Sequence, residues 1–491
     1  MTTPASPKIV THDIVAKLWN LCNILKDGGV TYHQYVIELT YLLFLKMAKE
    51  TGVESKLPEQ YRWNSLIEAD KDQKLDAYRT LLTHIGYSSK SALVKEIFAE
   101  ADTSIRRPAI FSRLLEEMEK LEWYRAHKED IGDLYEGLLE KNASEKKSGA
   151  GQYFTPRPLI DCMVDVMKPS IKDIIQDPAA GTGGFLISAN RFILEHENPS
   201  AWTKAQKEKY RYGTFYGMEL VHDTHRMALM NLMLHGLDYD PERTGIWYGD
   251  TLGKDAARLP QASLILSNPP FGSKKGGGLP ERDFGFPTSN KQFAFLQHIY
   301  LGLQKGGRAA VVMPDNVLFE ANTGRSIRIE LMDKCNLHTI LRLPTGIFYA
   351  QGVKTNVLFF TRGQTNKDNT REVWVYDMRA NMPNFGKKTT LVDDDYFKDF
   401  RRAFSSDPRG GVAGLSKRKD SGENGRFRRF SRKSIADRDN NLDISWLKDE
   451  NAAGDLPEPE ALAQQALGEL EAAIAELRSI LVELGSEVGS E

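Results

Sequence analysis

Short apolar segments alternate with helical ones between residue 151 and about residue 362. Predicted strands follow one another at residues 174–177, 215–219, 246–250, 264–267, 308–313, 337–343 and 354–361. Predicted helices separate several of them, at residues 185–196, 224–234 and 292–303. This alternation is typical of a mostly parallel sheet with helices on both faces. The sequence therefore predicts an α/β fold in which ligands bind at the carboxyl ends of the strands.

The sequence Asn268-Pro269-Pro270-Phe271 follows one of these strands directly. The strand ends there because neither proline has an N–H group for a ladder hydrogen bond. The residue before a proline is held extended, which fixes the direction of the Pro269 carbonyl. An amide oxygen and a carbonyl beside an aromatic ring can bind a flat group that carries an amino function. The alternative is a turn that only ends the strand.

A glycine-rich loop follows the strand that ends at Asp177. Its members are Pro178, Ala179, Ala180, Gly181, Thr182, Gly183 and Gly184. The glycines let the backbone approach a ligand closely, and the next helix offers free N–H groups. The spacing differs from the Gly-x-Gly-x-x-Gly fingerprint of dinucleotide sites. Asp177 would repel a pyrophosphate and attract the α-ammonium of an amino acid, which favours S-adenosylmethionine over NAD.

Two further carboxylates end strands, and a polar segment precedes the first strand. Glu219 can accept hydrogen bonds from both ribose hydroxyls, and Asp250 could accept one from an adenine amino group. A solvated side chain is the alternative at both positions. The segment before the first strand comprises Gln152, Tyr153, Phe154, Thr155, Pro156 and Arg157. It could close over a bound cofactor, or it is an ordinary turn into a helix.

At 491 residues the chain is too long for one hydrophobic core. We predict a helical N-terminal domain at 1–145, a catalytic α/β domain at 146–395, a basic low-complexity linker at 396–457 and a C-terminal helix at 458–491. N-terminal helices are expected at residues 32–50, 73–82, 91–99 and 110–118. Residues 397–433 carry twelve Lys or Arg against four Asp or Glu. This charge indicates a mobile segment near a polyanion or a solvated loop.

The last helix carries apolar residues at alternating three- and four-residue steps. They are Leu467, Leu470, Ile474, Leu477, Leu481 and Leu484. Such a narrow seam suits one partner helix, and the alternative is packing against the N-terminal helices.

Composition narrows the class of protein further. The net charge of −2 argues against uniform electrostatic binding of nucleic acid. Cys22, Cys162 and Cys335 form no metal-type pair and fit a reducing cytosol. The longest apolar segment is too short to span a membrane, and the N-terminus lacks the pattern of a secretory signal. We expect a soluble cytoplasmic protein without a metal site.

In their order along the chain, the segments 152–157 and 177–186, Glu219, Asp250 and Asn268–Phe271 resemble those of amino-methylating DNA methyltransferases. More narrowly, the chain resembles the modification subunits of type I restriction–modification systems. Further segments that carry this resemblance are 290–293, 297–298, 306–308, 313–314, 343–348 and 441–443. Phe271 stands where many relatives carry Tyr, so a hydroxyl contact there is in doubt while stacking on a base is retained.

The resemblance implies a class I S-adenosylmethionine-dependent methyltransferase fold with an all-α N-terminal domain and a C-terminal helical extension. It implies S-adenosyl-L-methionine held by residues 152–157, the loop at 182–184 and Glu219, and adenine N6 of a flipped-out base as the acceptor. Residues 363–454 are too few to read a long DNA site, so a separate specificity subunit is expected. The resemblance adds a second modification subunit and a restriction subunit. Methylation of a protein glutamine or an RNA amine, or a catalytically silent scaffold, remains the alternative.

Overall fold

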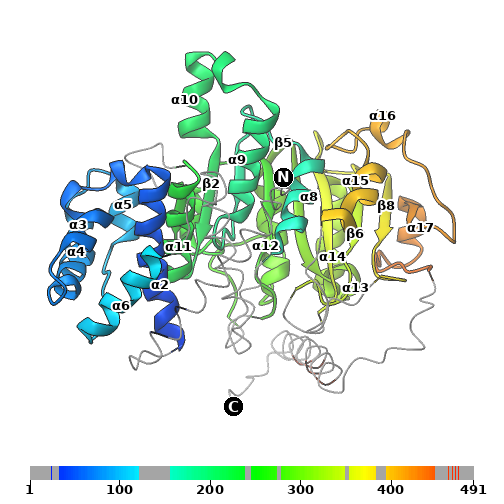
Figure 1. Cartoon of the computed structure of the whole chain (residues 1–491). Coiled ribbons are helices and arrows are strands. Elements are labelled where there is room, and N and C mark those ends of the chain that lie inside the picture. The colour runs from blue at the N-terminus through cyan, green and yellow to red at the C-terminus, as the bar shows by residue number, and fades with distance from the viewer. Residues whose placement is uncertain are drawn as a thin grey trace, which may run out of the picture. The chain divides into compact units, whose positions relative to one another are not determined.

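The computed structural model of this chain describes residues 32–120, 155–237, 245–273, 278–348, 353–382 and 394–447, with Leu21, Ile24 and four positions of the last helix. The chain divides into two compact units (Figure 1). The first unit comprises residues 1–146, 181–183 and 221–248, and the second comprises residues 147–180, 184–220 and 249–491. Each unit has its own core.

Helices make up most of the described part of the first unit. They are α2 (Tyr32–Thr51), η1 (Val53–Lys56), η2 (Glu59–Tyr61), α3 (Trp63–Glu68), α4 (Lys74–Ser88), α5 (Ala92–Ile97), α6 (Pro108–Glu119) and α11 (His222–Leu234), with the short strand β3 (Ile246–Tyr248). Aromatic side chains fill the core, and the rings of Tyr78 and Phe111 stack with centroids 4.9 Å apart. The predicted helical N-terminal region is confirmed.

Helix α11 belongs to this unit although it follows the second strand in the sequence. The Arg226 guanidinium lies over the Tyr41 ring, 5.5 Å from its centroid, and Nη2 donates to the Ala99 carbonyl at 2.6 Å. These contacts attach α11 to α2 and to the end of α5. Helical periodicity alone gave no sign of this association.

The second unit is built on a mixed sheet. Its strands are β1 (Ile175–Asp177), β2 (Phe215–Glu219), β4 (Ala262–Ser267), β5 (Leu303–Pro314), β6 (Cys335–Arg342), β7 (Thr355–Arg362), β8 (Glu372–Asp377) and β9 (Phe427–Ser431). They lie in the order β2-β1-β4-β5-β7-β6-β8-β9. The first four strands of this order are parallel, β7 runs antiparallel to both neighbours, and β6 and β8 are parallel. The carboxyl ends of β1, β2, β4, β5, β6 and β8 therefore share one edge.

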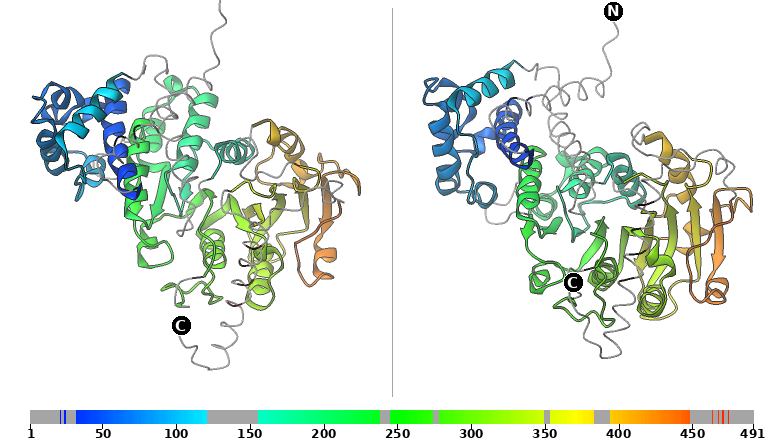
Figure 2. Two further views of the ribbon diagram at one scale, coloured as in Figure 1. Left: turned by 60° about the horizontal axis from the view of Figure 1, so that its bottom comes forward. Right: turned by 90° about the horizontal axis from the view of Figure 1, so that it is seen from below.

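Helices cover both faces of this sheet (Figure 2). They include α8 (Arg157–Met167), α9 (Gly184–His196), α10 (Lys204–Gly213), α12 (Lys291–Gly302), α13 (Asn316–Phe319), α14 (Asn322–Lys334) and α15 (Lys398–Phe404). Helices α8 and α15 pack against each other, as do α12 and α14. All six residues of β4 are buried, as expected for a strand with both faces covered. The predicted mostly parallel sheet with helices on both faces is confirmed.

A buried ion pair joins β5 to the segment before β1. Arg308 Nη1 lies 2.9 Å from Asp173 Oδ1, and its Nε donates to the Met167 carbonyl at 2.8 Å. Burial alone would raise the pKa of Asp173, but the hydrogen bonds and charge of Arg308 outweigh it and hold that pKa below its usual value. Arg308 is one of the residues that carry the family resemblance, and its described contacts are structural.

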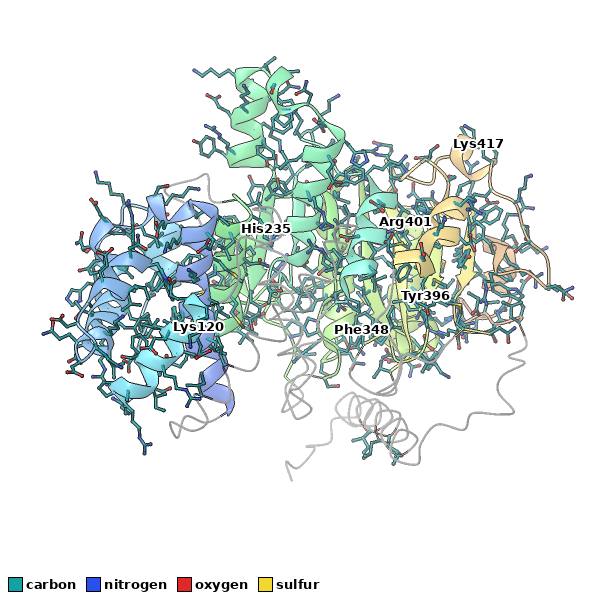
Figure 3. The ribbon with its side chains drawn as sticks, viewed as in Figure 1. Lys120, His235, Phe348, Tyr396, Arg401 and Lys417 are labelled. Carbon is teal, nitrogen blue, oxygen red and sulfur yellow. The ribbon has the colours of Figure 1, made fainter. Side chains whose placement is uncertain are left out.

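The basic segment at 397–433 is folded, which differs from the mobile or solvated segment expected from its charge. It contains α15, α16 (Val412–Leu415), β9 and the start of α17 (Arg432–Ala436). Arg418 is buried against the ring of Phe404, with the guanidinium carbon 4.9 Å from the centroid, and donates to the His338 carbonyl at 3.2 Å. The neighbouring Lys417 is exposed at the surface of this segment (Figure 3). Aromatic residues spaced along the segment form a buried core, which the net charge of the segment did not predict.

The proposed domain boundaries stay predictions. Residues 121–154, 383–393 and most of 448–491 lie outside the described residues. In the last helix, the described side chains of Leu467, Leu470 and Ile474 are exposed, and Leu477, Leu481 and Leu484 are outside the described part. No helix in the described ranges is long and apolar enough to cross a membrane.

Candidate catalytic and cofactor-binding site

The predicted site residues of the second unit lie at the edge where β1, β2 and β4 end. Asp177 is the last residue of β1, Glu219 is the last residue of β2, and Asn268 follows β4. The strands are adjacent and parallel, with Asp177 opposite Gly217 in the register. The structure therefore brings together three polar side chains that the sequence separates by tens of residues.

Asp177 connects the ends of β1 and β4. Its Oδ1 accepts hydrogen bonds from the Ser267 hydroxyl at 2.7 Å and from the Ala179 N–H at 3.1 Å. Burial raises the pKa of Asp177 to about 7, with a smaller contribution from the negative charge of Glu219 and against the opposing effect of these two hydrogen bonds. The surroundings of Asp177 therefore disfavour its charged form, and a cationic ligand would stabilise that form.

Asn268 presents one satisfied and one unsatisfied end of its side-chain amide. Its Nδ2 donates to the hydroxyl of Thr155 at 3.0 Å. Its Oδ1 is buried and has no hydrogen-bond partner within the described ranges. Buried polar atoms without a partner are uncommon and costly, so a bound group that donates hydrogen bonds would fit here.

The chain after Asn268 is held in place by the first turn of α12. Gly272 has φ of +90°, in the left-handed region that favours glycine. Its N–H donates to Gln292 Oε1 at 3.0 Å, and its carbonyl accepts from the Lys291 N–H at 2.9 Å. Pro269 is buried, while Pro270 and Phe271 are partly exposed. Phe271 thus stands between a fixed strand end and a fixed turn.

The buried side of α12 holds the loop that continues from this turn. Gln297 accepts from the Phe286 N–H at 3.1 Å and donates to the Phe286 carbonyl at 2.9 Å. His298 Nδ1 lies 2.8 Å from Arg282 Nη1. Burial lowers the pKa of His298 to about 3, with a further contribution from the Arg282 charge, so the ring is neutral and Nδ1 accepts this hydrogen bond. Arg282 also reaches the Thr251 carbonyl at 3.5 Å.

Sequence reasoning missed the roles of Ser267, Gln292, Gln297 and His298. Ser267 had a signal, because it directly precedes Asn268 at the strand end. The other three lie in the segments 290–293 and 297–298, which carried the resemblance without a stated role. Their hydrogen bonds show that these segments position the loop after Phe271.

Glu219 and Asp250 both lie partly exposed near the sheet edge. The Glu219 carbonyl accepts from the Gly249 N–H at 3.0 Å, which brings the segment of Asp250 beside the end of β2. Asp250 Oδ1 accepts from the Leu252 N–H at 2.9 Å, within its own turn. Its carboxylate oxygens keep further acceptor capacity for a ligand. The Thr251 hydroxyl donates to the Pro178 carbonyl at 2.5 Å and ties this turn to the loop after β1.

The glycine-rich loop has the backbone conformation that its glycines permit. Gly181 and Gly183 have φ of +54° and +84°, which side chains rarely adopt. A Cβ on Gly184, where α9 begins, would lie 3.1 Å from Ile160 Cδ1 of α8. The Thr182 carbonyl accepts from Asn231 Nδ2 at 3.0 Å. This contact involves the backbone of Thr182, so the predicted role of its side chain in cofactor binding stays a prediction.

The remaining predicted cofactor residues divide into two groups. Thr155, Pro156 and Arg157 lead into α8, and Arg157 Nε lies 3.5 Å from Asp161 Oδ1. Gln152, Tyr153 and Phe154 lie outside the described residues. Within the described ranges, no group of three or more His, Cys, Asp or Glu side chains could hold a metal ion.

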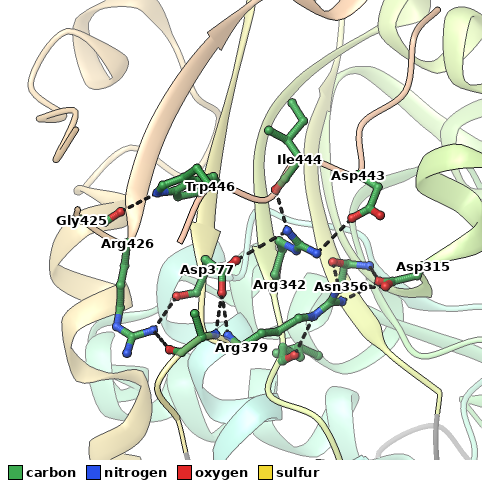
Figure 4. A network of polar contacts seen from close by, with 12 residues as sticks. Asp315, Arg342, Asn356, Asp377, Arg379, Gly425, Arg426, Asp443, Ile444 and Trp446 are labelled. Carbon is green, nitrogen blue, oxygen red and sulfur yellow. Dashed lines mark hydrogen bonds and ion pairs between the residues drawn. The ribbon is translucent and has the colours of Figure 1, made fainter. Parts of the chain in front are cut away.

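A dense polar network occupies the other half of the same sheet edge, at the ends of β5, β6 and β8 (Figure 4). Arg379 binds both oxygens of Asp315, at 2.9 and 2.5 Å, and donates through Nε to the Leu343 carbonyl at 3.2 Å. Arg342 donates to Asp443 Oδ1 at 3.0 Å. Segments 343–348 and 441–443, which carried the resemblance, are thus connected to the sheet here.

Two family models match the chain. The model described as N-6 DNA Methylase matches residues 126–453, and the HsdM N-terminal domain model matches residues 14–118. The first of these covers well over half of the chain.

Individual proteins match over nearly the whole chain. The EcoKI type I restriction enzyme methylase subunit of Escherichia coli K12 is 48% identical over 97% of this chain and 96% of its own length. The StySPI methylase subunit of Salmonella potsdam is 47% identical with the same coverage. The crystal structure of the EcoKI M protein superposes with a TM-score of 0.57 at 44% identity, covering 97% of both chains.

Proposed function

Because the chain belongs to the N-6 DNA methylase family, among the methylase subunits of type I restriction enzymes, we propose that Asn268 and Pro269 bind the adenine amine that it methylates. The chain is an S-adenosylmethionine-dependent, adenine-specific DNA methyltransferase by family. The proposal concerns which residues carry this activity. Asn268, Pro269, Pro270 and Phe271 form the proposed catalytic segment.

The observation that carries the proposal is the buried, unpartnered Oδ1 of Asn268. An acceptor in that state lacks a donor, and the exocyclic amine of adenine offers two N–H groups. Asn268 Oδ1 and the Pro269 carbonyl can take one each. Both acceptors are preorganised, since Asn268 is fixed through Thr155 and Pro269 is buried between β4 and Pro270.

The chemistry follows from the electronic structure of the amine. Its lone pair is delocalised into the adenine ring, which makes it a poor nucleophile. Two hydrogen-bond acceptors draw the nitrogen toward tetrahedral geometry and stabilise the positive charge that develops on it. S-Adenosylmethionine, when bound, supplies the electrophilic methyl group. This role needs neither a covalent nucleophile nor a general base with a shifted pKa in the catalytic segment.

The residues present fit S-adenosylmethionine. Asp177, buried with a raised pKa, suits the α-ammonium group, and the partly exposed Glu219 suits the ribose hydroxyls. The left-handed glycines at 181 and 183 allow a close backbone approach. We assign the adenine amino group to Asp250, and residues 152–157 and 182–184 to the remainder of the cofactor.

The target adenine must leave the duplex to reach Asn268, at a cost of a few kcal/mol. Stacking on Phe271, which is partly exposed, offsets part of this cost. Target choice is assigned to a separate specificity subunit, because we identify no element of the described ranges as a reader of a DNA site. The proposed assembly contains two modification subunits, the specificity subunit and, for cleavage, a restriction subunit, and acts on cytoplasmic DNA.

Asn268→Ala tests the catalytic assignment. Losing one preorganised acceptor should cost on the order of 3 kcal/mol of transition-state stabilisation, a rate loss of roughly a hundredfold or more. Methyl transfer from labelled S-adenosylmethionine to unmethylated DNA measures the rate, and calorimetry measures cofactor affinity, which should be largely unchanged. Asn336→Ala is the matched control. The Asn336 side chain donates to the Gly410 carbonyl at the amino end of β6, which is the edge of the sheet opposite to Asn268. Near-normal turnover of Asn268→Ala would remove the assignment.

The same assay separates the alternative functions. Label that enters unmethylated DNA but not fully methylated DNA supports DNA methylation. Label in protein or RNA would support a different substrate, and no label with intact cofactor binding would support a silent scaffold.

Deletion of residues 458–491 tests the proposed docking element. The truncated chain should lose the specificity subunit in co-purification while its cofactor affinity stays unchanged. Unchanged assembly would remove this role from the terminal helix.

A further inference from the structure

The Asn268 amide has two chemically different ends, and one orientation serves the proposed function. With Oδ1 toward the amine, an acceptor meets a donor. With the amide turned over, its NH₂ group would meet the N–H groups of the substrate. We propose that Thr155 is a positioning residue that anchors the Asn268 side chain, so that one end of its amide stays directed at the substrate. This inference rests on the proposed function and assigns Thr155 a role beyond cofactor binding.

The contact itself is a single hydrogen bond between two fixed elements. Thr155 Oγ1 accepts from Asn268 Nδ2 at 3.0 Å, and Thr155 lies 113 residues earlier in the chain. Thr155 is 9% exposed and directly precedes Pro156, which caps the start of α8. Asn268 directly follows β4, whose six residues are all buried. Neither partner can move far without disturbing a buried element.

The polarity of this contact leaves the reactive end free. Because Nδ2 is used toward Thr155, Oδ1 points away from it and stays without a partner in the described part of the chain. A threonine hydroxyl that accepts this hydrogen bond still has its own hydrogen to donate. Thr155 belongs to the proposed cofactor segment at 152–157. It therefore connects this segment to the catalytic amide.

Thr155→Val provides the first test, because valine has nearly the shape of threonine and no hydroxyl. Nδ2 then loses its acceptor and the amide loses the contact that anchors it. We expect kcat for methylation of unmethylated DNA to fall about tenfold, the equivalent of one neutral hydrogen bond. The measurement uses the chain co-purified with its specificity subunit. Thr155→Ser keeps the hydroxyl and should retain kcat within about threefold.

Cofactor binding provides a readout that does not depend on turnover. Because Thr155 also belongs to the proposed cofactor segment, calorimetric titration with S-adenosylmethionine should show a loss of affinity in Thr155→Val that is smaller than the loss of kcat at saturating cofactor. Fluorescence of 2-aminopurine placed at the target adenine should still rise on binding, because Phe271 is untouched. A positioning role thus lowers kcat at saturating cofactor by a larger factor than it lowers the affinity of either binding step.

Asn268→Ala provides the sharper test. It removes the amide that Thr155 anchors. Thr155→Val should therefore lower kcat by less than about threefold in the N268A background. A role of Thr155 in packing alone would lower kcat by the same factor in both backgrounds.

Four results would overturn the proposal: unchanged kcat in Thr155→Val, equal losses in the Ser and Val variants, equal losses in both backgrounds, or a cofactor affinity that falls as much as kcat. If N268A shows no measurable turnover, the comparison of Ser with Val, read with the two binding measurements, decides. Failure of the proposed function is recognised separately, because it appears as near-normal turnover of Asn268→Ala.

Discussion

The polar groups at the two halves of one sheet edge differ in how they are paired. At the ends of β5, β6 and β8, the three guanidinium nitrogens of Arg379 all donate hydrogen bonds, to Asp315, Leu343, Thr355 and Asn356. At the ends of β1 and β4, a buried oxygen of Asn268 has no partner, and Asp177 is buried with a raised pKa. The first half is stabilised by ion pairs, although the buried Arg342 Nε and the Thr355 hydroxyl have no partner among the residues described there. In the second half the uncompensated buried groups are an amide acceptor and a carboxyl with a raised pKa, which a ligand can use.

Arg379→Met should have the largest effect on stability. It leaves the Asp315 carboxylate, 17% exposed, without its bidentate partner. Breaking a buried ion pair from one side costs about 3–5 kcal/mol, so the free energy of unfolding should fall by that amount in urea titrations. Arg325→Met is the control, since the Arg325–Asp439 pair is exposed and should contribute under about 1 kcal/mol. Equal losses in both variants would mean that the network adds nothing beyond an exposed pair.

Glu219→Gln tests the ligand-facing half. Loss of the charged acceptor should weaken S-adenosylmethionine binding by about 1.5–3 kcal/mol, roughly ten- to a hundredfold, in calorimetric titration. The stability of the protein without cofactor should change by under about 1 kcal/mol, because Glu219 is partly exposed. Glu208→Gln on the exposed side of α10 is the matched control. Unchanged affinity in Glu219→Gln would remove this residue from the cofactor site.

Asp177→Asn should stabilise the protein at high pH, with the opposite sign to Arg379→Met. Burial raises the pKa of Asp177 from 3.8 to about 7, so the native protein holds a proton that the unfolded chain has released between these values. The contribution of Asp177 to stability is therefore full below about pH 4 and is lost as the pH rises through about 7. At about pH 8 the variant should exceed the unchanged protein by about 1–2 kcal/mol.

Thermal unfolding at several pH values measures this difference. The advantage of Asp177→Asn should disappear at about pH 4, where both residues are neutral. An advantage that stayed constant with pH would show that the Asp177 charge is not its cause. Cofactor affinity should fall in the same variant, because the amide cannot attract an ammonium group by charge.

Gly272→Ala should have the smallest effect. A Cβ there would meet nothing within 4 Å, so the cost is the left-handed backbone alone, about 1 kcal/mol. We expect a similar loss of stability and a decrease in kcat of a few-fold, as the turn after Phe271 shifts. Gly302→Ala, at the end of α12 with a negative φ, is the control and should cost less. A kcat equal to that of the control would mean that this turn does not position Phe271.

Much of the second unit follows from local sequence. Apolar runs predict β2 at its observed bounds and place β4 directly before Asn268, because proline pairs end a strand wherever it lies. Glycines at 181 and 183 mark a loop because only glycine adopts a positive φ without strain. These are properties of a few adjacent residues, which is why they can be predicted without the fold.

Other features depend on residues that are distant in sequence. Charge density predicted a mobile or solvated segment at 397–433, yet Arg418 is buried against Phe404 and β9 pairs with β8. Helix α11 reads as an ordinary crossover helix, yet Arg226 attaches it to Tyr41 of the first unit. Composition and periodicity do not reveal such partners, since packing between distant segments decides them.

The sequence by itself determined that Asn268 stands at a strand end beside a fixed proline carbonyl and an aromatic ring. The tertiary structure decided how that amide is anchored, because its NH₂ group donates to Thr155, which lies 113 residues away in the chain. It also decided that Asp177 is buried against Ser267 with a pKa near 7. The order of residues along the chain determines which residues lie at each strand end. The hydrogen bonds between those residues and their removal from water arise only when the fold brings the strand ends together.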